Sequence, residues 1–281
     1  MSVICIDATH LKAKTRGVLL VAVCKDGNEM IYPLAFGFTN SECTESWTWF
    51  LKKLYKLIQY SDRVLLVLDQ YNGIFNAMEA IFSDAAHGIC AYHLSQNLKR
   101  FCKQRDYVIS LYYHATYVYH IKDFDRLMVE LKETYHKVYD ELQGVGIKMF
   151  SRSHCPRKRY FFMTTSIAEL MNSCLVAFRK LSITAMAECI RDLLQRWFYY
   201  RRKNACEMSI YLTTFADKQI KDRIDTTQQC EIHLIHFNKF KVDGKWKVKT
   251  IDLDERSCSS REWDLDDLPC SHVIEICFPI F

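Results

Sequence analysis

Apolar residues along the first 90 positions are spaced as in an α/β unit. Continuous apolar runs, typical of buried strands, alternate with stretches in which apolar residues recur every three or four positions, as on one face of a helix. The expected elements are strands at Val3–Ile6, Val18–Cys24 and Met30–Phe38, a helix over Trp47–Ile58, a strand at Val64–Leu68, a helix at Ile74–Phe82 and a strand at Gly88–Ala91. This order predicts a mixed sheet with helices.

The pattern is helical from Tyr92 to about Gly144, which is too long for a loop and predicts a helical insertion. Amphipathic helices are expected at Thr165–Lys180 and Thr184–Lys203. Two strands, His233–Lys241 and Lys245–Leu253, flank Asp243-Gly244, a hairpin signal. We therefore expect an α/β core over residues 1–205 with a helical insertion at about 92–160, a linker at 206–230 and a small C-terminal region at 231–281.

Composition excludes several classes of protein. Gly and Pro together make 12 of 281 residues, which rules out collagen-like and low-complexity chains. Apolar runs stay far below the ~18 residues that cross a bilayer, and the N-terminus carries no leader pattern, so no membrane partner is expected. The 13 cysteines then indicate reduced thiols in the cytosol or nucleus, most of them in the core.

The net charge of +5 permits an anionic partner, and its distribution says more. One basic stretch without acids comprises Lys148, Arg152, Arg157, Lys158 and Arg159. A second, Arg196–Lys203, carries Trp197 and three further aromatic residues. Both stretches also fit plain solvated surfaces.

Three carboxylates could carry chemistry. Asp7 and Asp69 each end an apolar strand run, where a carboxylate is costly unless it is hydrogen-bonded, paired or bound to metal. On adjacent strands the two would bind a hard cation such as Mg²⁺, although Asp also commonly ends strands. Glu169 has two interpretations: Ser166-Ile-Ala-Glu169 fits a helix capping box, and the spacing alone favours that cap over a third carboxylate of the site.

Cysteine and histidine pairs offer further ligands. Cys90 and His93 stand where a strand is predicted to run into a helix. Three interpretations are open: half of a zinc site, an orienting pair, or a core thiol beside a surface histidine. Cys258, Cys270 and His272 follow the hairpin and are the best metal candidate, one ligand short of a closed zinc site. Stray thiols on a surface strand are the alternative.

Taken in order, these segments resemble the transposases of plant Mutator-like elements over nearly the whole chain. Asp7-Ala-Thr-His-Leu-Lys12 resembles the family's D-G-T-F/H-L-K, Leu68-Asp-Gln-Tyr-Asn-Gly-Ile74 its second acidic motif, and Cys90-Ala-Tyr-His93 its C-x-x-H. Residues 152–160 resemble its S-R-x-H-C-x-x-x-R-Y stretch, and Thr164 to Ser173 the motif T-T-N-I-A-E-S-M-N-S, which carries a third acid. The chain end resembles a SWIM-type zinc finger, C-x-C-x(n)-C-x-H.

The resemblance implies an RNase H-like fold in which Asp7, Asp69 and Glu169 form a DDE triad, overriding the capping interpretation. Such a triad holds Mg²⁺ or Mn²⁺ for DNA strand cleavage and strand transfer. The stretch Lys148–Arg159 would then contact DNA phosphates. Further implied properties are Zn²⁺ at Cys258, Cys270 and His272, nuclear localisation, a possible homo-oligomer and no small-molecule substrate.

Departures from the family pattern concern the zinc finger most. Ser260 stands where the pattern has its second Cys, so zinc affinity should fall. Ala8, Gln70, Leu170 and Asp267 replace family residues beside the motifs. The chain also begins six residues before Asp7, without the amino-terminal DNA-binding region that such transposases usually have, which we expect of a fragment, a decayed copy or a shortened gene model.

Two functions therefore stay open. The intact triad favours an active DNA transposase core. Ser260 and the short N-terminus favour a catalytically inactive or domesticated nuclear module that binds DNA or protein. A structural zinc module on an inert helical scaffold is a third interpretation.

Overall fold

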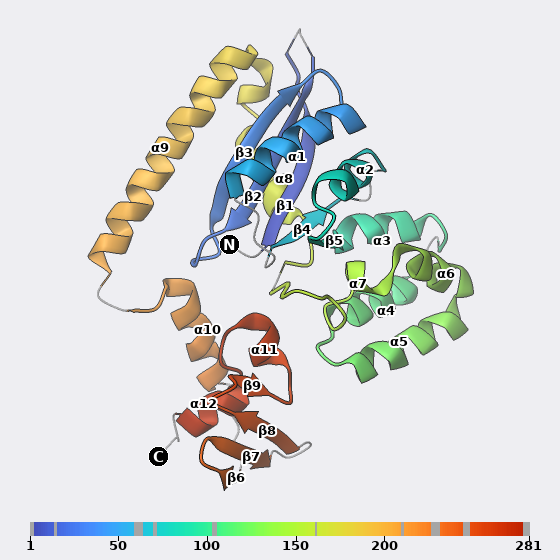
Figure 1. Ribbon diagram of the computed structural model, residues 1–281, viewed down its shortest axis with the longest axis vertical. Coiled ribbons are helices and arrows are strands. Elements are labelled where there is room, and N and C mark those ends of the chain that lie inside the picture. The colour runs from blue at the N-terminus through green and yellow to red at the C-terminus, as the bar shows by residue number, and fades with distance from the viewer. Residues whose placement is uncertain are drawn as a thin grey trace. The chain divides into compact units, whose positions relative to one another are not determined.

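The computed structural model describes residues 3–13, 16–58, 64–69, 72–102, 106–160, 162–208, 211–225, 231–243 and 248–277 (Figure 1). The chain forms two compact units. The first comprises Met1–Leu94 and Thr164–Tyr211, and the second comprises Ser95–Met163 and Leu212–Phe281. Each unit is thus built from two separate stretches of sequence.

The first unit is built on a five-stranded mixed sheet in the order β3-β2-β1-β4-β5. Its first three strands are antiparallel neighbours, whereas β1, β4 and β5 run parallel. The strands are β1 (Val3–His10), β2 (Val18–Lys25), β3 (Ile31–Thr39), β4 (Leu65–Leu68) and β5 (Ala86–Ile89). All five predicted strands of this unit are confirmed, and the mixed α/β arrangement is consistent with an RNase H-like core.

Helices cover both faces of this sheet (Figure 1). On one face α1 (Thr44–Ile58) and α2 (Asn72–Ile81) pack against alternate strand residues such as Ile4, Ile6 and Leu66. Burying these apolar side chains contributes roughly 1.5–3 kcal/mol each to the stability of the unit. Strand alternation turns the intervening residues toward α8 (Ser166–Cys174), which contacts β1, β2 and β3.

The helix predicted over Thr165–Lys180 is wrong in its second half. α8 ends at Cys174, and the backbone tightens into successive i→i+3 hydrogen bonds that lead into a 3₁₀ turn, η1 (Phe178–Lys180). The guanidinium of Arg179 donates a 2.7 Å hydrogen bond to the carbonyl of Asn172, so a side chain takes the place of the next helical N–H. The amphipathic pattern continued through this bend and hid it.

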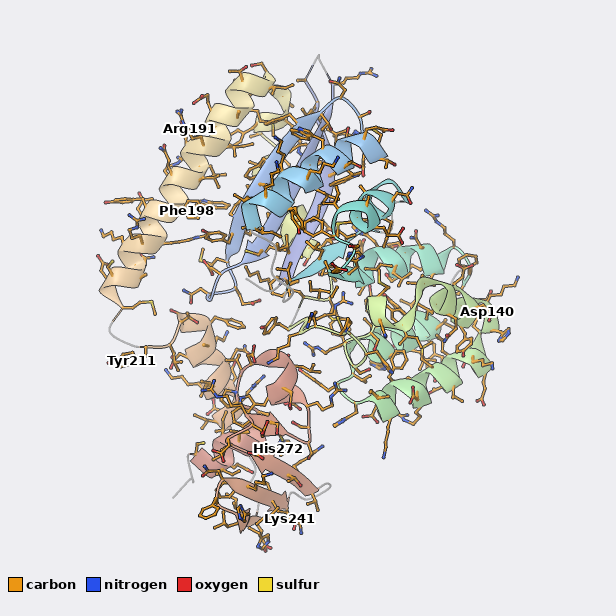
Figure 2. All side chains as sticks on the ribbon, viewed as in Figure 1. Asp140, Arg191, Phe198, Tyr211, Lys241 and His272 are labelled. Carbon is orange, nitrogen blue, oxygen red and sulfur yellow. The ribbon has the colours of Figure 1, made fainter. Side chains whose placement is uncertain are left out.

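Helix α9 (Ile183–Glu207) confirms the second predicted helix and is unusually exposed. Ser182 caps its start by accepting a hydrogen bond from the amide of Ala185. Only Met186 and Ile190 are buried among its residues, while Leu193, Leu194 and Trp197 are half-buried. Arg191 and Phe198 project from it (Figure 2), and the Phe198 ring packs against Tyr32 of β3.

The second unit contains the helical segment and the C-terminal region. The helical pattern predicted from Tyr92 is confirmed, as five successive helices. They are α3 (Ala91–Lys99, whose first turn belongs to the first unit), α4 (Asp106–Tyr117), α5 (Ile121–Thr134), α6 (His136–Val145) and α7 (Ile147–Phe150). Their apolar stripes form a core that includes Tyr112, Phe124, Leu131 and Phe150.

The C-terminal region is a four-stranded antiparallel sheet in the order β6-β7-β8-β9, preceded by α10 (Thr214–Asp225), which lies in the stretch expected to be linker. The remaining elements are β6 (Glu231–His236), β7 (Lys239–Asp243), β8 (Val248–Asp252), β9 (Ser257–Cys258), α11 (Glu262–Asp266) and α12 (Ser271–Cys277).

The predicted hairpin is present as the antiparallel pair β7–β8, although its turn at Gly244 lies outside the described residues. The strand predicted over His233–Lys241 is two strands, because the chain turns at Phe237, whose φ is 30°. Among the described helices, none is long and apolar enough to cross a membrane.

Candidate functional site

The parallel pairing of β1 and β4 brings two of the predicted carboxylates together. Cys5 pairs with Val67, so the register continued by two residues sets Asp7, inside β1, beside Asp69, which directly follows β4. Both side chains then leave the sheet on the face that α8 covers, because side chains at alternate strand positions share a face. Sheet topology therefore brings two carboxylates that are 62 positions apart in sequence to neighbouring strand positions.

Helix α8 adds the third carboxylate. The helix begins after Thr165, which makes no side-chain cap hydrogen bond, and Glu169 lies in the first turn. The Glu169 carboxylate does not fold back as a capping box requires; its Oε1 lies 3.5 Å from Nε2 of His93. The capping interpretation from spacing is therefore wrong. Glu169 lies with Asp7 and Asp69 in a group that we call the acid cluster.

His93 stands between the acids. Its Nδ1 lies 3.3 Å from Oδ1 of Asp69, while Nε2 faces Glu169. A hydrogen bond with the Cys90 sulfur, helped by the charges of Cys90, Asp69 and Glu169, raises the pKa of His93 to about 9 against the effect of burial. At neutral pH the ring is therefore an imidazolium that offsets part of the negative charge of the cluster.

Cys90 anchors this histidine. The thiol is buried, and the amide of Thr165 donates a 3.3 Å hydrogen bond to its sulfur, which links the end of β5 to the start of α8. Burial raises the pKa of Cys90, but hydrogen bonds from His93 and Thr165 outweigh burial and leave the pKa below its usual value. Of the interpretations open for Cys90 and His93, the orienting pair fits these contacts.

Asp7 is the most enclosed acid of the three. Burial, with a smaller contribution from the charge of Glu169, raises the pKa of its carboxyl to about 6 despite hydrogen bonds to Ala8 and Asn172. The side-chain amide of Asn172 donates a 2.8 Å hydrogen bond to Oδ2 of Asp7. Asp69 and Glu169 are nearly half exposed, at 46% and 43%, so the cluster is open to solvent on their side.

Asn172 is a site residue that reasoning from single residues missed. It lies three positions after Glu169, a spacing that sets two side chains on one helix face. Its carbonyl oxygen Oδ1 is buried and, among the described residues, has no hydrogen-bond partner. Carboxylate and amide oxygens are ligands of hard divalent cations, so an orphaned oxygen beside three acids fits such a cation.

The basic stretch Lys148–Arg159 divides into buried and exposed cations. Arg152 and Arg159 are only 5% and 1% exposed, so their assignment to DNA phosphates is corrected: their guanidinium groups are held inside the second unit. Arg159 donates 2.8 Å to the carbonyl of Met149, and Arg152 donates to the carbonyl of Tyr160 and faces Asp266 at 3.4 Å. Lys148, Arg157 and Lys158 are exposed, with Lys158 paired to Asp267.

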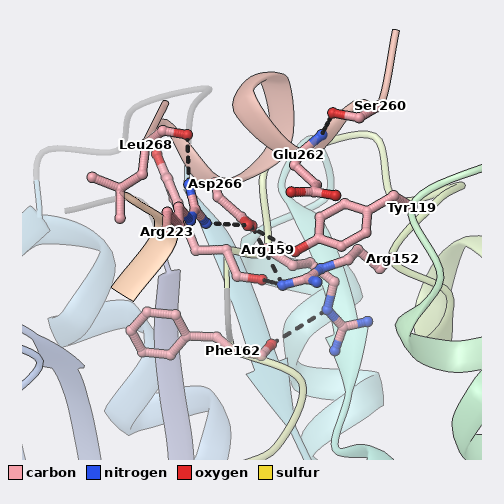
Figure 3. A network of polar contacts seen from close by, with 10 residues as sticks. Tyr119, Arg152, Arg159, Phe162, Arg223, Ser260, Glu262, Asp266 and Leu268 are labelled. Carbon is pink, nitrogen blue, oxygen red and sulfur yellow. Dashed lines mark hydrogen bonds and ion pairs between the residues drawn. The ribbon is translucent and has the colours of Figure 1, made fainter. Parts of the chain in front are cut away.

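Asp266 is the centre of a buried network that joins the helical segment to the C-terminal region (Figure 3). Its carboxylate, from which solvent is excluded, accepts a 2.8 Å hydrogen bond from the hydroxyl of Tyr119 and lies 3.6 Å from the guanidinium of Arg223. Arg223 of α10 also donates to the carbonyls of Leu268 and Pro269. These contacts fix the loop that leads directly into Cys270.

The second candidate site is the cluster of Cys258, Cys270 and His272. One potential ligand atom from each lies within 4.8 Å of the others. Both thiols are buried in the small core with Val242 and Ile251, so the alternative of stray surface thiols is wrong. Nδ1 of His272 is buried without a hydrogen-bond partner within the described part of the chain. Two thiols and an imidazole with a free nitrogen could hold zinc.

The two thiols are hydrogen-bonded to each other. A hydrogen bond from Cys270, with smaller contributions from Ser260, lowers the pKa of Cys258 to about 6 against burial, whereas the same pairing and burial raise the pKa of Cys270 to about 12. Ser260, which replaces the expected ligand, accepts a 3.4 Å hydrogen bond from the amide of Glu262 and donates its own amide to the sulfur of Cys258. The hydroxyl is therefore already engaged inside the turn.

Comparison with known proteins bears on the first unit. No curated protein matches this chain. The stretch of this chain that matches a family model includes Asp7, Asp69, Cys90 and His93, and it ends before Glu169 and the C-terminal region. Residues 3–97 match the MULE transposase domain, which implies DNA transposition chemistry and a DNA partner for this part of the chain.

Proposed function

We propose that the first unit is the catalytic core of a Mutator-like DNA transposase, which cleaves and joins DNA strands with divalent cations. The observation that carries this proposal is the convergence of Asp7, Asp69 and Glu169 from two parallel strands and a facing helix. The match of residues 3–97 to the transposase domain supports it independently.

The residues present fit a pair of hard cations. The three carboxylates would hold them, with the orphaned Oδ1 of Asn172 as a further oxygen ligand. Bound Mg²⁺ or Mn²⁺ supplies polarisation of a phosphodiester and activation of water or a 3′-hydroxyl for in-line attack. Asn172 orients Asp7 through its amide, and the imidazolium of His93 holds Asp69 and Glu169 near one another before cations enter.

A titration with Mn²⁺ tests this proposal. We expect saturable binding to the purified chain by calorimetry, abolished in the Glu169→Gln variant. Glu188→Gln, an exposed carboxylate on α9, is the matched control and should bind as the wild type does. Mn²⁺-dependent nicking of a labelled duplex should follow the same pattern.

Indifference of Mn²⁺ binding to Glu169 would contradict the proposal. In that case the chain would be better described as a non-catalytic module of transposase descent that binds DNA or protein.

The proposal assigns zinc to the second unit. Cys258, Cys270 and His272 would hold Zn²⁺ as a structural ion with three protein ligands, because the Ser260 hydroxyl is a poor ligand beside thiolates. Binding should therefore be weaker than at a four-ligand finger. Competition with a chromophoric chelator measures this affinity directly.

A further inference from the structure

A cavity of about 680 Å³ opens at the edge of the first unit's sheet. Its described walls are residues 10–13 and 16–18, which lie between and at the ends of β1 and β2, and residues 40–42, which precede α1. The volume falls within the ~300–1,000 Å³ typical of ligand pockets. We call this cavity the strand pocket.

The strand pocket lies next to the acid cluster. β1 runs from Asp7 directly into His10 in the pocket wall, three residues or about 10 Å along an extended strand. Glu42, in the opposite wall, is close enough to Asp69 and His10 for both to act on its pKa, which burial raises. At the ~3.4 Å rise per nucleotide of a strand stacked as in duplex DNA, about three nucleotides span the step from the cluster to the pocket.

The wall of the strand pocket is held in place by backbone hydrogen bonds. The amide of Leu11 donates 2.9 Å to the carbonyl of Gly17, and the amide of Lys12 donates 2.9 Å to the carbonyl of Arg179. Gly17 has a φ of 128°, and a Cβ there would meet the Thr39 carbonyl oxygen at 2.9 Å, so this position requires glycine. A preorganised wall loses little entropy when a ligand binds.

Two basic side chains line the strand pocket. Lys12 and Arg16 are exposed, and neither has an ion pair with a carboxylate in the described part of the chain. Arg152, Arg159 and Arg223 in the second unit are instead engaged with carbonyls or with Asp266. Asn40 and Ser41 add polar groups to the opposite wall.

We propose that the strand pocket binds the single-stranded DNA that flanks the reacting phosphate, with Lys12 and Arg16 contacting its phosphates. This inference rests on the proposed function, because it takes the reacting phosphate to lie at the acid cluster. The rigid wall and free cations favour a phosphodiester chain over a neutral ligand. Among the described residues that line the pocket, Glu42 is the one acid, and it is half-buried.

The test measures DNA binding by the full chain in Ca²⁺. The probe is a fluorescein-labelled duplex with a single-stranded 3′ overhang, followed by anisotropy from 50 to 300 mM salt. The variant is Lys12→Gln/Arg16→Gln, and the control is Lys122→Gln/Lys137→Gln, which removes two exposed cations from the second unit. Loss of two phosphate contacts should reduce the slope of log Kd against log salt by about 1.4 and weaken binding about tenfold near 0.15 M salt. A blunt duplex should show a smaller loss.

An unchanged slope and affinity in the Lys12→Gln/Arg16→Gln variant would overturn the inference, as would an equal loss in the control. If the double variant unfolds, Lys12→Gln alone should lower the slope by about 0.7. Mn²⁺ binding by the wild type and by Glu169→Gln decides the proposed function separately. Mn²⁺ binding that needs Glu169, together with DNA binding indifferent to the two cations, would reject the strand pocket and leave the proposed function standing.

Discussion

The acid cluster of the first unit and the thiol cluster of the second, Cys258, Cys270 and His272, differ in how the charge of their ionisable groups is compensated. Both bring groups that favour ionisation into a partly enclosed space. The acid cluster offsets its charge with the His93 imidazolium and keeps two carboxylates nearly half exposed. The two thiols of the thiol cluster are buried, and a hydrogen bond joins Cys258 and Cys270. We therefore call the acid cluster the open cluster and the thiol cluster the closed cluster. The open cluster suits exchange of cations and substrate, and the closed cluster suits a resident structural ion.

The largest expected effect is zinc dependence in the closed cluster. Zinc should stabilise the second unit by about 5 kcal/mol, below the ~10–16 kcal/mol of four-ligand finger peptides, and Cys270→Ser should remove this gain. Thermal unfolding with zinc and with chelator measures it. Cys206→Ser, an exposed cysteine on α9, is the control and should keep the zinc response. Equal zinc responses in the two variants would reject the closed site.

The next largest effect tests what holds the closed cluster in place. Asp266→Asn leaves the guanidinium groups of Arg152 and Arg223 without their buried counter-charge, and should destabilise the second unit by about 3–5 kcal/mol. Zinc affinity should also fall, because the loop before Cys270 loses its anchor. Urea unfolding followed by circular dichroism, with chelator competition, measures both quantities.

Asp267→Asn provides the matched control for that experiment. Asp267 is the next residue, but its pair with Lys158 is exposed, so its loss should cost under about 1 kcal/mol. Equal losses in the two variants would show that burial of Asp266 does not matter.

The two clusters also differ in how far sequence could reveal them. Asp7 and Asp69 were predictable because each ends an apolar strand run, and the parallel register then forces them together. Glu169 was not decidable from spacing, since a capping box and a site residue share the same pattern and only the position of His93 separates them. Most helical and strand elements were likewise readable from periodicity. The exceptions include the bend after Cys174, the turn at Phe237 and α10, which lies in the stretch expected to be linker.

No local pattern in the sequence predicts the network around Asp266. Arg152 and Arg159 lie in a basic run that indicates a phosphate surface, yet both are buried because Asp266 and backbone carbonyls accept their hydrogen bonds. Asp266 is 114 residues from Arg152, and nothing local marks either as a partner of the other. Long-range charge pairing of this kind depends on tertiary structure, which periodicity does not encode.

A smaller effect, in which a substitution raises the free energy of unfolding, is expected at the open cluster. Burial raises the pKa of Asp7 from 3.8 to about 6, so the stability that its protonated form contributes is full below pH 3.8 and is lost as pH rises through 6. Asp7→Asn should therefore stabilise the metal-free protein at pH 8 by about 1–3 kcal/mol, and by little at pH 4. Urea unfolding in EDTA, followed by tryptophan fluorescence, measures this gain. Asp84→Asn, exposed in the same unit, should be neutral at both pH values, and a gain there as large as that of Asp7→Asn would remove burial as the cause.

The smallest effect is a difference in how metal affinity depends on pH. Mn²⁺ competes with the proton on Asp7, so its affinity should rise about tenfold per pH unit below pH 6 and level off above it. Zinc must displace the proton of the Cys270 thiol, whose pKa is raised by the hydrogen bond with Cys258 and by burial, so zinc affinity should still rise about tenfold between pH 7 and 8. Titrations of the wild-type chain with each metal at pH 5, 6, 7 and 8 compare the two slopes. A Mn²⁺ slope that persists above pH 7 would mean that His93 must release its own proton, which would make it a ligand and not the counter-charge of the open cluster.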